Sequence, residues 1–172
     1  MSRKQVAVIA GAVPAFLAMV AVYQYAPRIF AHLELPAGDA GSRLAFVVHW
    51  LLLPGLTLLA GVVGAARRGF FADAIDGTRT PANHGLEINL RYNINTLEQV
   101  ALAAIAWSGV ALVVSPDRLL VIPTMAILFA VGRVTFWIGY LLRPTARAFG
   151  MVLTGFPTVA AFAWLGWRLL GG

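Results

Sequence analysis

Five long apolar stretches restrict what this chain can fold into more than any other feature. They cover residues 5–26, 44–66, 88–114, 119–142 and 148–170. Each is close to the roughly 20 residues that a helix needs to cross the hydrocarbon core of a bilayer. Because 60% of the 172 residues are hydrophobic and 12% are charged, a soluble domain could not bury this much apolar surface. The expected fold class is therefore all-α, an integral membrane helical bundle.

Two ionisable residues lie inside these stretches. Glu98 and Arg133 are each roughly nine residues from the end of their stretch on the same side of the membrane, so both are expected about 14 Å deep. An unpaired charge at that depth is costly, which makes both residues candidates for a functional site. Further side chains continue each charge along one helical face: Arg91, Asn95 and Glu98 on the third stretch, and Arg133, Phe136 and Tyr140 on the fourth.

These two faces would form a polar cleft if they meet. Four guanidinium groups are expected at its mouth: Arg68, Arg91, Arg143 and Arg147. Guanidinium groups bind carboxylates through two parallel hydrogen bonds, and Glu98 could hold an ammonium group. The matching ligand is small and zwitterionic, with more than one carboxylate, while an apolar substrate would enter from the bilayer. The chain has no Cys, so any thiol chemistry needs a thiol that the ligand brings.

The distribution of Lys and Arg predicts the orientation. With the N-terminus in the cytoplasm, the cytoplasmic side holds Arg3, Lys4, Arg67, Arg68, Arg79, Arg91, Arg143 and Arg147, and the other side holds Arg28, Arg43, Arg118 and Arg168. This bias of 8 against 4 favours a multi-pass protein of the inner or cell membrane with a cytoplasmic N-terminus. The cleft then opens to the cytoplasm, beside a polar loop expected at 67–87.

Other partners are excluded by the placement of charges. The net charge is +6, but the basic residues form short clusters at helix ends, which fits anionic lipid head groups and not nucleic acid. His32, His49 and His84 are too scattered for a metal site.

Three motifs resemble those of one membrane family. The segment RYNINTLE, from Arg91 to Glu98, resembles the R-x-x-x-N-x-x-E signature of the membrane-associated proteins in eicosanoid and glutathione metabolism (MAPEG). The segment GRVTFWIGYLLRPTAR, from Gly132 to Arg147, is similar to the third-helix motif of that family and is in register with leukotriene C synthase. ARRGF, from Ala66 to Phe70, is similar to the basic end of the first family helix.

The resemblance implies a homotrimer that binds glutathione between protomers. A four-helix family domain would occupy 44–172, and 1–43 would form an extra N-terminal transmembrane helix with its connecting loop. Glutathione would be held by Arg68, Arg91, Asn95, Glu98, Arg133 and Tyr140. Arg147 matches the arginine that stabilises the thiolate, and the expected activity is that of a glutathione transferase or peroxidase acting on an apolar electrophile or hydroperoxide.

Several alternatives remain open at this level. Gln99 and Phe136 replace family tyrosines, and together with the extra helix this favours a non-catalytic lipid-binding protein or an accessory membrane subunit with the same fold. Glu98 and Arg133 could also form a purely structural ion pair that fixes the register of two helices. Arg147 could equally bind lipid phosphates at a helix end.

Overall fold

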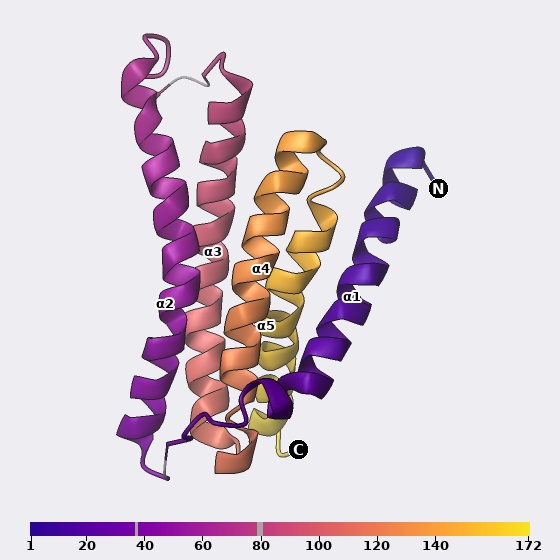
Figure 1. Ribbon diagram of the computed structural model, residues 1–172, viewed down its shortest axis with the longest axis vertical. Helices are drawn as coiled ribbons and strands as arrows, with labels where there is room; N and C mark the ends of the chain where they lie inside the picture. The colour runs from indigo at the N-terminus through magenta and orange to yellow at the C-terminus, as the bar shows by residue number, and fades with distance from the viewer. Residues whose placement is uncertain (37, 79–80) are drawn as a thin grey trace.

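The computed structural model describes residues 1–36, 38–78 and 81–172, and the regular structure in these ranges is helical. Its α-helices run alongside one another (Figure 1). They are α1 Arg3–Ile29, α2 Ala40–Ala65, α3 His84–Val113, α4 Val121–Leu142 and α5 Ala148–Leu169, joined in part by two short 3-10 helices, η1 Ala66–Phe70 and η2 Pro116–Arg118. Within these described ranges, five helical segments are long and apolar enough to cross a membrane. The predicted all-α membrane bundle is confirmed.

Side-chain caps determine where three of the helices begin. Ser2 and Gln5 form a reciprocal capping box at the start of α1. At the start of α2, Asp39 accepts a 2.8 Å hydrogen bond from the backbone N–H of Ser42, and Asn83 caps α3 in the same way at 2.9 Å. Such caps satisfy backbone donors that have no partner inside the helix. As a result α2 and α3 each begin four residues before the apolar stretches predicted from 44 and 88.

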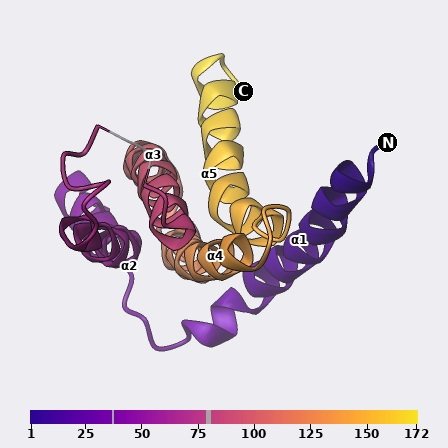
Figure 2. The ribbon, with the colours of Figure 1, turned by 90° about the horizontal axis from the view of Figure 1, so that it is seen from above.

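Helix α4 lies at the centre of the bundle, whereas α1 and α2 lie at opposite edges. Seen from above, α2 and α3 lie to one side of α4 and α1 lies to the other (Figure 2). Within their most apolar windows, 61% of α4 is buried but only 11% of α1. Helix α1 packs on α5 and α4, and α2 packs on α3 and α4. The connection from α1 to α2 therefore crosses the bundle, at the end where the C-terminus lies (Figure 1).

Glycines bring α4 and α5 into close backbone contact. A Cβ on Gly132 would lie 2.9 Å from the backbone nitrogen of Thr154, and one on Gly139 would lie 2.7 Å from the carbonyl oxygen of Ala146. A Cβ on Gly150 would overlap the backbone of α4. Small residues at helix interfaces allow this approach in membranes, where packing replaces the hydrophobic effect between helices. This contact fixes α5, and the segment that leads into it, relative to α4, which carries Arg133.

The two ends of the bundle differ in polarity. Toward the C-terminal end of α3, Trp107 packs edge-to-face on Phe129 of α4, with ring centroids 6.1 Å apart. The indole nitrogen of Trp107 donates to the hydroxyl of Thr158 at 3.3 Å, which satisfies this buried donor within the apolar core. The first half of α3 instead buries Asn89, Tyr92 and Thr96. The candidate site lies at this polar end.

Candidate functional site

Arg133 joins the polar faces of α3 and α4. Its side chain is fully buried, and its Nη1 donates a 2.9 Å hydrogen bond to Oδ1 of Asn95. The two faces that the sequence predicts therefore meet at this pair. Within the described residues, Nε and Nη2 of Arg133 have no hydrogen-bond partner. These two N–H groups can still donate to an acceptor. Because unpaired buried donors are costly, a ligand that accepts from them would be stabilised.

Aromatic rings supply the rest of the environment of Arg133. Its guanidinium carbon lies 4.1 Å from the centroid of Phe136 and 4.9 Å from that of Tyr92, both within the range of cation–π interactions. The hydroxyl of Tyr92 donates to the carbonyl oxygen of Thr57 on α2 at 3.0 Å, and its ring stacks on Trp137 at 4.6 Å. Tyr92 is thus a supporting residue that the sequence analysis missed, although its spacing from Asn89 and Thr96 marks a polar helical face.

Four of the predicted site residues line one cavity between α3, α4 and α5. The cavity has a volume of about 240 Å³ and its lining consists of Arg91, Asn95, Phe136, Tyr140, Arg147 and Met151. The guanidinium carbon of Arg147 lies 4.5 Å from the ring centroid of Tyr140. Arg147 itself is exposed, because it sits where the α4–α5 connection enters α5. Arg143 does not belong to this lining, although the sequence also places it at the mouth.

Arg133 does not line this cavity. Two of its neighbours do: Asn95 through the hydrogen bond and Phe136 through the ring contact. The charge of Arg133 therefore acts on the cavity from behind these two side chains. With two guanidinium groups, one amide and one phenol around it, the cavity is suited to a small anionic molecule.

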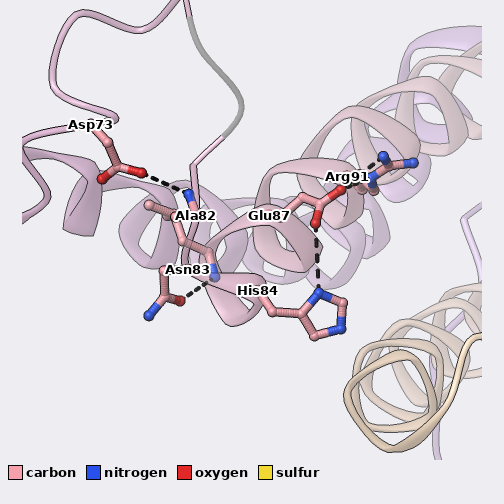
Figure 3. A network of polar contacts seen from close by, with 7 residues as sticks. Asp73, Ala82, Asn83, His84, Glu87 and Arg91 are labelled. Carbon is pink, nitrogen blue, oxygen red and sulfur yellow. Dashed lines mark hydrogen bonds and ion pairs between the residues drawn. The ribbon is translucent and has the colours of Figure 1, made fainter.

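Arg91 is already paired within the protein. Its Nε and Nη2 donate to Oε1 of Glu87 at 3.1 Å and 2.8 Å (Figure 3). Oε2 of the same carboxylate lies 3.6 Å from Nδ1 of His84. The paired residues are three or four positions apart on an exposed part of α3, where solvent weakens the attraction between their charges. An incoming carboxylate would compete with Glu87 for Arg91.

Arg68 lies near the site but lines a different cavity. Its Nε donates to the carbonyl oxygen of Ala74 at 3.0 Å, which ties η1 to the following turn. Asp73 in that turn accepts from the backbone N–H of Ala82 at 2.7 Å (Figure 3). The second cavity, of about 530 Å³, is lined by Arg68 and also by Glu87 and Arg91. Arg91 therefore borders both cavities. Arg79, which the sequence also places on this side, lies outside the described residues.

Glu98 does not pair with Arg133 as the sequence suggested. Within the described part of the chain no hydrogen bond or ion pair involves its carboxylate, and Glu98 is exposed midway along α3. Its level was misjudged, because Arg133 meets Asn95, and Glu98 lies three residues, or about 4.5 Å, beyond it. Its direction was also wrong. The buried face of α3 runs through Tyr92 and Thr96, and this turns Glu98 outward.

Comparison with known protein families identifies one family for most of the chain. The sequence model of the MAPEG family matches residues 44–167. The chain belongs to the MAPEG family. The match spans α3 and α4 and nearly all of α2 and α5, and it includes all the predicted site residues, whereas α1 lies outside it. No curated protein and no solved structure matches the chain.

Proposed function

We propose that this MAPEG protein is a membrane-bound glutathione-dependent transferase or peroxidase. The observation that carries the proposal is the cavity in which Arg91, Asn95, Tyr140 and Arg147 converge. Glutathione has two carboxylates, one ammonium group and one thiol, so it needs both cationic and hydrogen-bonding partners. The guanidinium, amide and phenol groups provide these within one small volume. Arg133 also fits such a site, because its Nη1 holds the amide of Asn95 in one orientation while its Nε and Nη2 have no partner among the described residues.

In this proposal most of the site binds glutathione and one residue acts on the thiol. Arg91, Asn95 and Tyr140 contact the tripeptide directly, Arg133 positions Asn95, and Arg68 contributes positive charge from the adjoining cavity. Glu98 would bind the ammonium group.

Arg147 is the proposed catalytic residue. A thiol with a pKa of about 8.5 is only a few per cent ionised at neutral pH, and a neighbouring cation lowers that pKa. The exposed guanidinium of Arg147 would stabilise the thiolate, while the thiol proton passes to solvent. The sulfur then attacks the electrophilic carbon of an apolar substrate, so that a C–S bond forms and the bond to the leaving group breaks.

We also propose that a homotrimer completes the site. The cavity volume of about 240 Å³ lies below the roughly 300–1,000 Å³ of most small-molecule sites, which fits a site finished by another protomer. An exposed carboxylate in the middle of a membrane helix likewise needs a polar neighbour. Glu98 would find that neighbour, and the ligand ammonium group, at the junction with the next protomer.

The membrane arrangement follows from the same proposal. The N-terminus and the site would lie on the cytoplasmic side of the inner or cell membrane, where glutathione is dissolved, and the apolar substrate would arrive through the bilayer. Residues 44–172 would form the catalytic domain, and residues 1–43 an added helix with its connection. Anionic lipid head groups would contact the arginines at the helix ends.

A conjugation assay tests the catalytic role. The protein purified in nanodiscs is mixed with glutathione and 1-chloro-2,4-dinitrobenzene, and the release of chloride accompanies formation of the thioether. Arg147→Gln should reduce the rate at neutral pH about tenfold or more and move the pH–rate profile upward by about one unit, because the thiol pKa rises. Arg143→Gln is the matched control, since Arg143 is exposed on the same connection but does not line the cavity.

One observation favours a second candidate function. Phe136 lines the cavity without a hydroxyl, and Arg91 is already bound to Glu87, so the site has fewer free polar groups than its composition suggests. The second candidate is a non-catalytic lipid-binding protein or an accessory membrane subunit. No thermal stabilisation by millimolar glutathione, together with no conjugation, would favour it and reject the enzyme.

A further inference from the structure

A separate cavity lies at the other end of the bundle. It has a volume of about 330 Å³ and is enclosed by parts of α1, α3, α4 and α5. Its wall is mainly apolar, with Val110, Met125 and Pro157 among the buried residues that form it. Helix α1 contributes Met19 and lies outside the family match, so this cavity is a feature of the added helix.

Two polar side chains enter this apolar lining. Tyr23 projects from α1 one turn after Met19, and Arg118 projects from η2. Within the described residues, no hydrogen bond or ion pair uses the hydroxyl of Tyr23 or the guanidinium of Arg118. Asp117 precedes Arg118 but does not line the cavity. Among the described residues, the guanidinium of Arg118 and the hydroxyl of Tyr23 thus border an otherwise apolar cavity without a protein partner. This arrangement matches a ligand with an anionic head group and an apolar chain.

The directions of the helices place Arg118 at a membrane surface and the apolar lining of the cavity deeper in the membrane. Arg118 lies between the end of α3 and the start of α4, which is a membrane surface. Met125 is seven residues further along, and a helix rises about 1.5 Å per residue, so the apolar wall extends inward from Arg118. Phe156 on α5 and Met19 on α1 lie deeper still, because both helices reach this surface only at their last residues. The cavity therefore runs from a cationic mouth toward the middle of the bilayer.

We propose that this cavity binds a single-chain amphiphile with an anionic head, namely a long-chain carboxylate. Its carboxylate would accept hydrogen bonds from Arg118 and Tyr23, and its chain would lie among the apolar residues between α1 and α5. A cavity volume of about 330 Å³, at the low end of the roughly 300–1,000 Å³ usual for ligands, favours one chain over the two of a phospholipid. This site is independent of the proposed glutathione chemistry.

Photoaffinity labelling tests the site in the full-length protein. The protein is placed in nanodiscs of zwitterionic phospholipid and exposed to a C16 carboxylic acid with a mid-chain diazirine, or to its methyl ester. We expect the acid to label the segments around Met19 in α1 and Phe156 in α5. The ester, which lacks the charge that Arg118 recognises, should label them several-fold less.

Two pairs of variants separate head-group recognition from filling of the cavity. Arg118→Gln should lower labelling by the acid about three- to fivefold and leave the ester unchanged, as expected for one solvent-accessible ion pair. Arg168→Gln, an exposed arginine on the same membrane side, should change neither. Ala160→Phe should fill the cavity and abolish labelling by both probes, whereas Val159→Phe, on the neighbouring lipid-facing surface of α5, should not.

Three results would overturn the proposal. The first is equal labelling by acid and ester that Arg118→Gln does not change. This result stands even if Ala160→Phe fails to fold, because Arg118 is exposed and its replacement leaves the helices intact. The second is label spread evenly over lipid-facing helix surfaces. The third is a co-purified phospholipid or a second copy of the chain that occupies the cavity and resists displacement by the acid.

Discussion

Among the described residues, Arg43 and Arg133 are buried arginines with different hydrogen-bond partners, Arg43 at the start of α2 and Arg133 midway along α4. Arg43 is 7% exposed at the start of α2. Its Nη1 donates to the carbonyl oxygens of Ala111 and Val114 at 2.9 Å and 2.7 Å. These carbonyls end α3 without intrahelical partners and carry its partial negative charge. Arg43 is thus a C-terminal cap of α3, and among the described residues its buried Nε has no hydrogen-bond partner.

Arg133 has no such partner for its charge. It makes one hydrogen bond, to Asn95, and otherwise rests on the faces of Phe136 and Tyr92, with two donors left over among the described contacts. The difference teaches that burial of an arginine does not by itself mark a functional site. An arginine such as Arg43, whose two hydrogen bonds go to helix-end carbonyl groups, fixes the fold, whereas one such as Arg133, with a single hydrogen bond and a polar cavity beside it, can contribute to ligand binding.

The largest expected effect in this comparison is on stability. Arg43→Ala removes two charge-assisted hydrogen bonds and leaves buried carbonyls unpaired, so the free energy of unfolding should fall by about 2–4 kcal/mol. Thermal unfolding in nanodiscs measures this. Arg168→Ala, exposed at the same membrane side, is the control and should leave the transition unchanged. A variant Arg43→Ala that unfolds normally but loses glutathione binding would break the comparison.

Arg133→Gln should affect glutathione binding more than it affects stability. It removes a charge that is only partly compensated, so the unfolding transition should move less than in Arg43→Ala. Glutathione affinity should weaken about tenfold, because Asn95 loses its charged donor. Isothermal calorimetry gives the affinity, and the double variant Arg133→Gln with Asn95→Leu should bind no worse than the weaker single variant. Full additivity would mean that Arg133 does not act through Asn95.

Tyr92→Phe separates the role of the Tyr92 hydroxyl from that of its ring beside Arg133. It removes only the hydrogen bond to Thr57 and keeps the ring beneath Arg133, so the free energy of unfolding should fall by about 0.5–1.5 kcal/mol. The affinity for glutathione should stay close to that of the parent protein. Loss of binding with unchanged stability would place the Tyr92 hydroxyl in the ligand site itself.

The smallest effect is expected from Glu87→Gln. This change frees Arg91 from its ion pair, so glutathione should bind about two- to threefold more tightly at low salt, and the difference should shrink as salt is added. His84→Gln alters only the outer contact of Glu87 and is the matched control. Weaker binding by Glu87→Gln would show that the carboxylate orients Arg91 for the ligand and does not compete with it.

Much of this architecture could be predicted from sequence because membrane length and helical periodicity are local properties. The five spans, and the polar helical faces that carry Asn95 and Arg133, follow from the spacing of residues within single stretches. The rotation of α3 about its own axis does not. Tyr92 bonds to α2 and fixes that rotation, which turns Glu98 outward, and no pattern within α3 alone distinguishes this from the alternative rotation. The cavity at Arg118 was equally hidden, because α1 reaches it from a distant part of the sequence.

The missing Cβ atoms along the α4–α5 seam have a mechanical consequence. With Gly132 and Gly150 in near backbone contact, neither helix can roll or slide without steric overlap. Arg133 and Arg147 are therefore carried on one stiff hairpin, in which the main chain sets the distance between their Cα atoms. Any motion that opens the polar cavity must come from α3 swinging against this hairpin.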